Sequence, residues 1–499
     1  MSTTHPPRSE KPSRMSQVVG SAQDTLLSLP GLDYLMIRIL VLFLTGIGVV
    51  MAFSTSMTWS VAEGATVWST ALRQCLMVAI GLMLFWVALK VPMRVVRSLA
   101  PWLLGLTLIL LIAVLIPGIG TGREEVGSQS WIPIGPVQLQ PSEIAKVAIA
   151  VWGANHLAGH RHDLTTIKSP FVQYVLVAGA FFLLIIAQGD VGMALSFAAV
   201  VAFTLIFAGI KWGIVASFAV VALLGMIGLF LSGGFRSQRF HTYFDALTGN
   251  FENTQNEAFQ TYQGYLSLAD GSLGGVGLGQ SRAKWFYLPE AKNDFVFAVI
   301  GEELGLWGGA LVIILFALLG FFGLRTAVRA SNQFQGLMAA ALTMGVVSQA
   351  FVNIGYVVGA LPVTGIQLPM ISAGGTSAVI TIGSMGLLAS VARHEPEAVS
   401  AMQSYGRPMF DRLFFIGEPN EDGGAKGERG RGLGGNAKPR AVPVTARRSS
   451  SLRPGGEDVS STGSGIVGQR PSRRSGHTRS SQRIRPSEPG SPDTFYRRR

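Results

Sequence analysis

Charged residues and cysteine are both scarce in this sequence of 499 residues. Asp, Glu, Lys and Arg make up only 14% of the chain, whereas soluble domains carry about 25%, so the composition argues against an ordinary soluble protein. The single cysteine, Cys75, excludes an internal disulfide framework and any multi-cysteine zinc site. The seven histidines show no metal-ligand spacing, and the sequence contains no recognisable Ser/His/Asp set. Hydrophobic residues, by contrast, make up 48% of the chain, and their distribution decides the class of protein.

The hydrophobic residues gather in ten runs, each long enough, or nearly so, to cross about 30 Å of hydrocarbon. The runs lie near 35–53, 72–91, 99–119, 143–159, 171–188, 191–210, 212–232, 294–322, 334–358 and 374–392. The sequence therefore predicts an all-α polytopic membrane protein, with ten transmembrane helices in a membrane domain over residues 35–392. The polar residues 1–34 have no cleavage site before the first run, and we expect them to be a cytoplasmic N-terminal segment.

The charges of the short loops predict the orientation of the chain. With a cytoplasmic N-terminus, the inner loops carry eight basic residues and one acid, whereas the outer loops carry two basic residues and four acids. The inner basic residues are Lys90, Arg94, Arg97, Arg161, Lys168, Lys211, Arg325 and Arg329. This bias follows the positive-inside rule. It places both termini in the cytoplasm and puts a large extracytoplasmic loop, 233–293, between helices seven and eight.

Residues 393–499 form a basic tail rich in Gly, Ser, Pro and Arg. The tail has 20 Lys and Arg against 11 Asp and Glu, whereas the first 392 residues have 20 against 17. Such a segment buries too little apolar surface to offset the entropy of ordering, so we expect a disordered cytoplasmic tail. Two roles stay open, a solvated tail near anionic lipid headgroups or a docking arm for an acidic cytoplasmic partner. Nucleic acid is not expected as a partner, because no aromatic residues interleave with the basic ones.

Ionisable groups inside or at the edge of membrane spans are costly, so each is a candidate functional residue. Glu143 and Lys146 are three residues apart in QPSEIAK, share a helix face and can form an ion pair. The pair either fixes helix register or belongs to a polar site at the head of the bundle. Pro141 suits a helix first turn, where Ser142 or Glu143 can serve the free backbone donors. Trp131, just upstream, has the position of an interfacial aromatic residue.

Asp294 lies where the large outer loop meets the eighth predicted span. There it is either an N-cap favoured by the helix dipole or a functional carboxylate. Gly301, Gly305 and Gly308 recur on the same stripe, which lets that stripe press against a neighbouring helix. Asp294 would then face the interior of the bundle.

Three further acids and one glycine-rich stretch complete the candidates. Glu302 and Glu303 follow Asp294 about 12 Å further along the predicted helix, with Lys146 as a candidate counter-ion. Asp190, in the tight outer turn QGDVG, is either functional or a simple turn residue. The stretch GGVGLGQ lacks the context of a nucleotide-binding loop and is expected to be a flexible outer segment. These residues indicate an outward-facing polar cavity suited to proton-coupled transport or to group transfer on a lipid-linked substrate.

Four motifs occur in a fixed order along the predicted spans: QPSEIAK, QGDVG, YLPEAKNDFVFAVIGEELG and LPVTGIQLPMISAGGTS. In this order they resemble the SEDS family of FtsW, RodA and SpoVE proteins over about residues 35–392. The resemblance implies a ten-helix fold. It also implies a peptidoglycan glycosyltransferase that polymerises lipid II at the outer face of the bacterial cytoplasmic membrane.

The resemblance also implies roles for individual residues. The family's essential acid corresponds to Asp294, which would act as general base on the acceptor sugar hydroxyl as undecaprenyl pyrophosphate leaves. The candidate substrate-binding or cavity residues are Trp131, Gln140, Ser142, Glu143, Lys146, Arg282, Lys284, Lys292 and Glu302. The departing pyrophosphate needs positive charge, from some of these cations or from a divalent cation, Mg²⁺ or Mn²⁺. No metal site built from protein residues is predicted.

The GEELG stretch beginning at Gly301 and the long basic tail resemble division-type FtsW proteins, with an elongation-type, RodA-like polymerase as the alternative. A division-type member would lie at the septum with a class B penicillin-binding protein, the septal transpeptidase. Other divisome proteins would be partners, including FtsZ through the tail. A lipid II flippase and a non-catalytic scaffold are the competing functions. A flippase needs polar groups along its whole path, whereas here the acids cluster near the outer face, which favours the polymerase.

Overall fold

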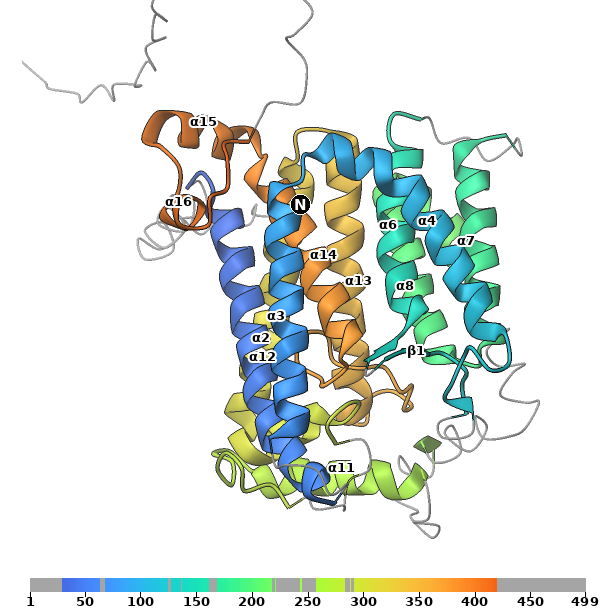
Figure 1. Cartoon of the computed structure of the whole chain (residues 1–499), viewed down its shortest axis with the longest axis vertical. Coiled ribbons are helices and arrows are strands. Elements are labelled where there is room, and N and C mark those ends of the chain that lie inside the picture. Colours follow the sequence, from blue (N-terminus) through green and yellow to red (C-terminus); the bar gives the residue numbers. More distant parts are fainter. Residues whose placement is uncertain are drawn as a thin grey trace, which may run out of the picture. The chain divides into compact units, whose positions relative to one another are not determined.

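The computed structural model describes residues 29–62, 68–123, 127–135, 137–160, 168–217, 220, 243–244, 257–282, 288 and 291–419. Helices dominate these residues (Figure 1). The helices are α2 (Leu32–Ala62), α3 (Ser69–Lys90), α4 (Met93–Leu115), α6 (Pro141–Leu157), α7 (Pro170–Ala187), α8 (Val191–Phe207), α11 (Glu257–Gly271), α12 (Val296–Arg329), α13 (Gln333–Val357), α14 (Thr376–Arg393), α15 (Pro396–Tyr405) and α16 (Met409–Leu413). One antiparallel hairpin joins β1 (Ile132–Ile134) to β2 (Val137–Leu139), with Ile132 opposite Leu139.

Seven described helices are long and apolar enough to cross a membrane, namely α2, α3, α4, α7, α12, α13 and α14. The apolar helix α8 and the helix α6 are slightly shorter, at 17 residues each. Each predicted span except 212–232 therefore coincides with a described helix, and the chain is a multi-pass membrane protein. Most of 212–232 lies outside the described residues, so the count of ten stays a prediction.

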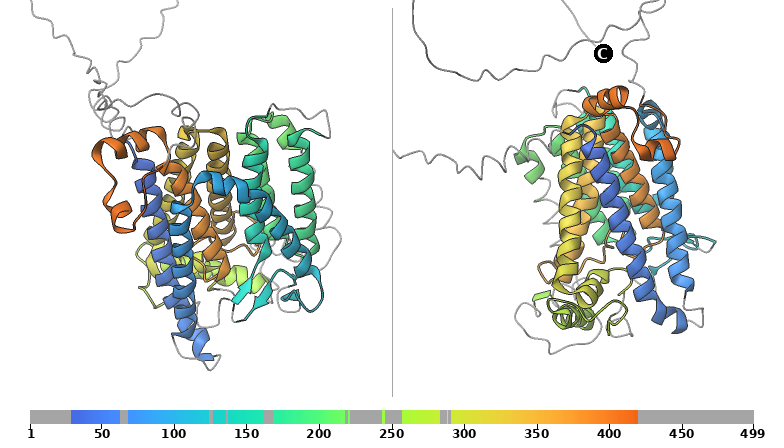
Figure 2. Two further views of the ribbon diagram at one scale, coloured as in Figure 1. Left: turned by 45° about the horizontal axis from the view of Figure 1, so that its top comes forward. Right: turned by 90° about the vertical axis from the view of Figure 1, so that its left-hand side faces the viewer.

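The helices α13 and α14 are the central ones. Within the apolar window of each, 72% of the residues are buried, against 22% in α4 and 28% in α7. Small residues allow this close packing, and a side chain at Gly386 of α14 would collide with the backbone of Phe85 in α3. The peripheral α4 instead exposes large apolar residues such as Trp102 and Ile109, which suit contact with lipid. Figure 2 shows the same bundle from two further sides.

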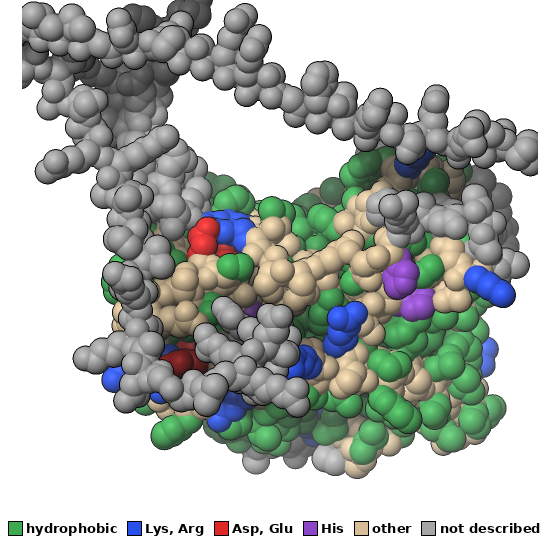
Figure 3. All heavy atoms as spheres, turned by 90° about the horizontal axis from the view of Figure 1, so that it is seen from above, with side chains coloured by type: hydrophobic (Ala, Val, Ile, Leu, Met, Phe, Trp, Pro, Cys, Tyr) green, Lys and Arg blue, Asp and Glu red, His purple; other side chains and the backbone are tan. Residues whose placement is uncertain are grey.

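The two ends of the bundle differ in what they carry (Figure 1). We call the end with β1, β2 and α11 the loop end, and the end with α15 and α16 the tail end. The last turns of α3, α12 and α14 place Lys90, Arg329 and Arg393 at the tail end. Figure 3, seen from that side, shows Lys and Arg at several places and Asp and Glu at fewer. The tail end is thus the end that the positive-inside rule assigns to the cytoplasm.

The helix α12 is broken at Gly305, where φ is 68° and ψ is −165°. Glycine alone adopts such a conformation readily, and a Cβ at Gly305 would lie 2.4 Å from the Gly275 nitrogen. The eighth predicted span therefore begins with a separate helical segment, 296–304. Glu302 and Glu303 lie on this first segment, just before the break. Their predicted rise of about 12 Å from Asp294 concerns this segment alone and stays a prediction.

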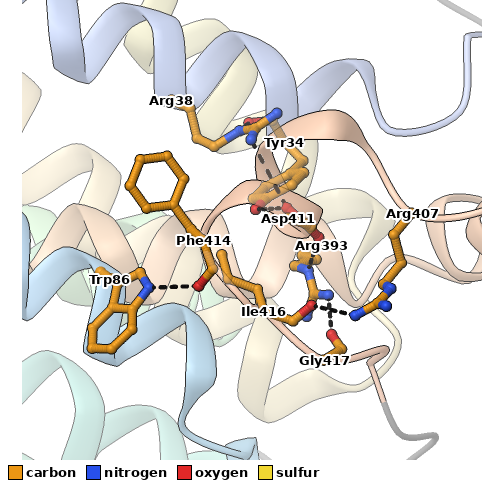
Figure 4. A network of polar contacts seen from close by, with 9 residues as sticks. All are labelled: Tyr34, Arg38, Trp86, Arg393, Arg407, Asp411, Phe414, Ile416 and Gly417. Carbon is orange, nitrogen blue, oxygen red and sulfur yellow. Dashed lines mark hydrogen bonds and ion pairs between the residues drawn. The ribbon is translucent and has the colours of Figure 1, made fainter.

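The beginning of the C-terminal tail is folded. Disorder was predicted from residue 393, but α15 and α16 occupy residues 396–413, and residues 420–499 lie outside the described part. Asp411 is completely buried and accepts hydrogen bonds from the Tyr34 hydroxyl and from Arg393 Nε, both at 2.7 Å (Figure 4). A second guanidinium, that of Arg38, lies 3.9 Å away. The composition of the whole tail could not reveal this local ion cluster, because the partners come from α2 and α14.

The carboxylate of Asp411 is predicted to hold α15 and α16 on the bundle. Asp411→Asn keeps the size but leaves two buried guanidinium groups without a counter-charge, which costs about 3 kcal/mol. We expect amide hydrogen exchange of residues 396–417 to accelerate strongly, as measured by mass spectrometry on the detergent-solubilised protein. Glu418→Gln removes an exposed carboxylate nearby and is the matched control. Equal exchange in both variants would contradict the assignment.

Gly305 is predicted to be required for the break in α12. Gly305→Ala forces a Cβ into backbone atoms at an unfavourable φ, which should destabilise the protein by at least about 2 kcal/mol. The control is Gly274→Ala, because a Cβ at Gly274 meets nothing within 4 Å. Thermal unfolding followed by tryptophan fluorescence should show a lower midpoint for the first variant only. An unchanged midpoint in Gly305→Ala would disprove the break.

Candidate functional site

Three buried polar residues form one face of α13 near the loop end, namely Gln349, Asn353 and Tyr356. Their spacing of four and then three residues places them on the same side of the helix. Each donates a hydrogen bond to a backbone carbonyl of the loop between α13 and α14, at Gln367 or Ile366, over 2.7 to 3.0 Å. We call these three residues the α13 polar face. The face fixes the irregular chain that closes the bundle at this end.

The α13 polar face and the loop that it holds also fix the chain just before α12. Three consecutive carbonyls, of residues 292–294, accept hydrogen bonds there. The donors are the Ala373 N–H to Lys292 (3.0 Å), the Ser372 hydroxyl to Asn293 (2.6 Å) and Asn353 Nδ2 to Asp294 (2.9 Å). The Tyr356 oxygen also lies 2.9 Å from the Asp294 carbonyl oxygen. The Phe295 ring packs against Tyr356, with ring centroids 5.7 Å apart. The backbone from Lys292 to Asp294 is therefore fixed by a hydrogen bond at each residue.

Asp294 itself is half-buried at the start of this segment. Helix α12 begins at Val296 with Phe295 as its N-cap, and no side chain caps it. The interpretation of Asp294 as an N-cap is therefore not supported. A carboxylate on a fixed backbone, partly open at the loop end, suits proton transfer to or from a bound substrate.

Glu143 and Lys146 form the predicted ion pair, with Lys146 Nζ 2.9 Å from Glu143 Oε2. Both side chains are buried, and Lys146 also donates a hydrogen bond to Gln349 Oε1. Gln349 lies one turn, about 6 Å, from Asn353 along α13. The α13 polar face therefore brings the Glu143–Lys146 pair and the Asp294 segment together.

The first turn of α6 is only partly as expected. Pro141 occupies the first helical position, as predicted, and Gln140 is the N-cap without a side-chain cap bond. Ser142 is buried, and its hydroxyl has no hydrogen-bond partner among the described residues, so its predicted capping role was wrong. Gln140 instead directs its Nε2 group to Asp190, where the donor–acceptor distance is 3.2 Å.

Asp190 caps α8 rather than merely forming a turn. Its Oδ1 accepts a hydrogen bond from the Met193 N–H at 2.9 Å. Burial raises the pKa of the Asp190 carboxyl, and the hydrogen bonds from the Met193 N–H and Gln140 Nε2 oppose this rise. The nearby Glu143 raises the same pKa further. Asp190 thereby couples the start of α8 to the start of α6.

A cavity of about 30 Å³ lies between α6, α8, α13 and α14, next to the ion pair. Glu143, Lys146, Gln349, Thr381 and Ser384 supply its polar lining. Such a volume holds about two water molecules. It is far too small for a sugar, so any large substrate would bind outside it, toward the loop end.

Glu302 and Glu303 hold the glycine-rich segment 272–282 against α12. The donors to their carboxylates are the Ser281 hydroxyl (2.7 Å) and the Arg282 N–H (2.6 Å) for Glu302, and the Ser54 hydroxyl (2.6 Å) for Glu303. Both side chains are almost fully buried. Lys146 pairs with Glu143 instead, so its expected role as their counter-ion was wrong. The stretch GGVGLGQ, expected to be flexible, is hydrogen-bonded to the backbone of both glutamates.

The remaining predicted residues lie around the loop end. Trp131 is half-buried where its carbonyl accepts a hydrogen bond from the Thr121 N–H. Arg282 is exposed and Lys292 is half-buried. Lys284 lies outside the described residues. Within the described part of the chain, no three His, Cys, Asp or Glu side chains are placed to hold a metal ion.

The α13 polar face was missed at the level of sequence. The signal was present, because Gln349, Asn353 and Tyr356 are polar residues at helical spacing within an otherwise apolar span. Polar residues inside a membrane span are candidate functional residues. The sequence analysis considered charged residues there and did not consider the amides of Gln349 and Asn353 or the hydroxyl of Tyr356.

Residues 34–397 match the family model FTSW_RODA_SPOVE, described as cell cycle protein. A probable peptidoglycan glycosyltransferase FtsW of Mycobacterium tuberculosis is 38% identical over 75% of this chain and 71% of that protein. The stage V sporulation protein E of Bacillus subtilis is 34% identical over 72% of this chain and 97% of its own length.

Two solved structures share the fold at 24% sequence identity. One is a chain of a peptidoglycan synthase complex that coordinates polymerization and crosslinking, with a TM-score of 0.58 over 72% of this chain and 97% of that chain. The other is the rod shape determining protein RodA of Thermus thermophilus, with a TM-score of 0.53 over 72% and 96%. These similarities concern the arrangement of the helices.

Removing one charge of the Glu143–Lys146 pair is predicted to destabilise the protein, and removing both charges is predicted to restore its stability. Lys146→Met leaves Glu143 buried without a counter-charge, at a cost of about 3 kcal/mol, whereas the double variant with Glu143→Gln leaves no buried charge. Thermal unfolding should show a lower midpoint for the single variant alone. Lys168→Met, at an exposed lysine, is the control. A double variant as unstable as the single one would refute the pairing.

Proposed function

The chain belongs to the FtsW/RodA/SpoVE family of cell cycle proteins, and we propose that it polymerises lipid II into β-1,4 glycan strands at the outer face of the cytoplasmic membrane. It is a multi-pass membrane enzyme of the peptidoglycan glycosyltransferase class, as its curated relatives are named. One observation carries the proposal. The half-buried carboxylate of Asp294 stands on a backbone that is hydrogen-bonded at three successive carbonyls.

In the proposed reaction Asp294 is the general base. It removes the proton from the 4-hydroxyl of the acceptor sugar while that oxygen attacks the anomeric carbon of the donor. The bond from that carbon to undecaprenyl pyrophosphate breaks, and inversion gives the β-1,4 linkage. Rigid placement matters, because a base contributes about 10²- to 10⁴-fold only within hydrogen-bond reach of its proton.

The leaving pyrophosphate requires positive charge near Asp294. Lys146 is the weaker candidate, because Glu143 already neutralises it in the interior. Lys292 lies two residues before Asp294 on the same fixed segment, and Arg282 is exposed at the loop end. We therefore assign the pyrophosphate contact to Lys292 and Arg282, together with Lys284.

A divalent cation at the pyrophosphate would depend on the substrate for ligands. The described residues offer it no cluster of His, Cys, Asp or Glu, and Mg²⁺ commonly binds through phosphate oxygens with one or two carboxylates. Bound through the phosphate oxygens, Mg²⁺ or Mn²⁺ would neutralise the charge that develops on the leaving group, while Asp294 keeps its role as general base.

The division role and its partners extend the same proposal. The FtsW names of the curated relatives support septal synthesis over the elongation alternative. The likeness to a chain of a peptidoglycan synthase complex supports a class B penicillin-binding protein as partner. With the tail end in the cytoplasm, Asp294 lies on the outer side of the membrane domain. The C-terminal tail then lies in the cytoplasm, where divisome proteins such as FtsZ can bind it; its residues 420–499 lie outside the described part.

Asp294→Asn is predicted to abolish polymerisation, because the amide preserves size but cannot accept the proton. The assay would follow lipid II in liposomes, with the purified protein and its cognate transpeptidase. Asp270→Asn, at an exposed carboxylate on α11, is the matched control and should polymerise normally.

A loss of about 10²-fold or more in Asp294→Asn alone supports the general base. If Asp294→Asn still makes glycan strands at the wild-type rate, Asp294 is not the general base. If the wild type, folded and bound to the transpeptidase, makes no strands, a lipid-scrambling assay decides between flippase and scaffold. The Glu143→Gln, Lys146→Met double variant, which we expect to be stable, separates the two open roles of that pair. If the pair takes part in the reaction, the double variant loses polymerisation activity; if the pair only fixes helix register, activity is retained.

A further inference from the structure

The family model matches the chain up to residue 397, so α16 and all but the first two residues of α15 lie beyond the matched region. The two helices are joined at Gly406, whose φ of 85° lets the chain reverse between them. Their contacts with the bundle are specific, since Asp411 is buried among Tyr34 and Arg393, and the Trp86 indole donates to the Phe414 carbonyl at 3.0 Å (Figure 4). This segment is a fixed part of the protein, and its surface can be examined for a partner.

The helix α15 has the polarity expected in water. Its apolar residues Ala398 and Met402 are buried against the bundle, at 1% and 6% exposure. Its outer side presents Glu397, Ser400 and Gln403. Apolar residues inside and polar residues outside are the usual arrangement for a helix at an aqueous surface.

The helix α16 has the opposite polarity. Asp411 points inward and is 0% exposed, whereas Met409 and Leu413, four residues apart on the outer side, are 84% and 66% exposed. Tyr405, the last residue of α15, and Phe415, two residues after α16, are 90% and 83% exposed. Large apolar side chains gathered in this way on a surface indicate contact with a protein or a membrane. A charge inside and apolar groups outside suit a helix whose outer side is not in water.

The position of α16 indicates which surface covers it. Its partners Tyr34 and Arg38 lie within the first seven residues of the span Leu32–Thr55, and Trp86 lies within the last five of the span Ser69–Lys90. At 1.5 Å per residue, this is within about 10 Å of the ends of both spans, the level of the headgroup and acyl boundary. Lys90 stacks on the Trp86 ring at 3.9 Å, an arrangement typical of the membrane interface.

The charges of the segment agree with a lipid surface. Between residues 405 and 415 the acid is Asp411, which is buried and paired. Arg407 and Arg412 are both exposed. The outer surface of this stretch therefore combines apolar side chains with positive charge, which is the combination that binds anionic bilayers.

We propose that α16 and its flanking residues form a membrane-interface site, in which Tyr405, Met409, Leu413 and Phe415 enter the headgroup and acyl boundary of an anionic bilayer. Arg407 and Arg412 contact the lipid phosphates. Residues 396–404 of α15 stay in water.

The test uses the full-length chain with Cys75→Ser and one new cysteine, Leu413→Cys on α16 or Ser400→Cys on α15 as the matched control. Both variants are placed in nanodiscs of phosphatidylglycerol and phosphatidylethanolamine, where each side of the bilayer is accessible. A membrane-impermeant maleimide should label residue 413 at least about tenfold more slowly than residue 400, because an apolar environment disfavours the reactive thiolate. Equal rates would overturn the proposal.

A second measurement identifies what covers the site. An environment-sensitive dye on residue 413 should be quenched by doxyl-labelled lipids and protected from iodide, with the reverse pattern on residue 400. Quenching of residue 413 by iodide without an effect of doxyl lipids would overturn the lipid assignment and leave the surface to a protein partner. Size-exclusion chromatography of each labelled variant establishes that the chain remains folded and monodisperse.

Discussion

The structure depends on one constraint, that backbone groups at the end of a membrane bundle must find hydrogen-bond partners in the protein. Two irregular stretches, the chain before α12 and the loop between α13 and α14, meet at the loop end without regular secondary structure. Gln349, Asn353 and Tyr356 supply the donors that both stretches need. Since Lys146 also bonds to Gln349, this one face of α13 sets the geometry of the whole candidate site.

Buried charge follows the same logic at the two ends of the bundle. At the loop end Glu143 neutralises Lys146, and at the tail end Arg393 neutralises Asp411. The first pair lies within α6 and the second joins α14 to α16. Removal of one partner would leave the other charge buried without a counter-charge. The half-buried Asp294 differs, because its backbone is fixed while its side chain remains partly exposed. That difference separates a carboxylate suited to chemistry from carboxylates that hold helices together.

Several features of the site were accessible from sequence. The Glu143–Lys146 pair follows from a spacing of three on a helix, and Pro141 marks the first helical position. The role of Glu302 and Glu303 in holding the glycine-rich segment was not accessible, because their partners lie 20 or more residues away or on another helix. Helix α16 was missed for a similar reason, since Asp411 and Tyr34 are 377 residues apart in the chain.

The sequence by itself determined that this is a polytopic helical membrane protein, where most of its spans lie and which family it belongs to. Hydrophobic run length and motif order are local properties, so no fold is needed to interpret them. The tertiary structure decided which buried charges pair, that α12 breaks at Gly305, and that Asp294 is no helix cap. It also decided that the first part of the tail packs on the bundle. These outcomes depend on contacts between distant segments, and the energy of a buried polar group is set by the partner that the fold brings to it.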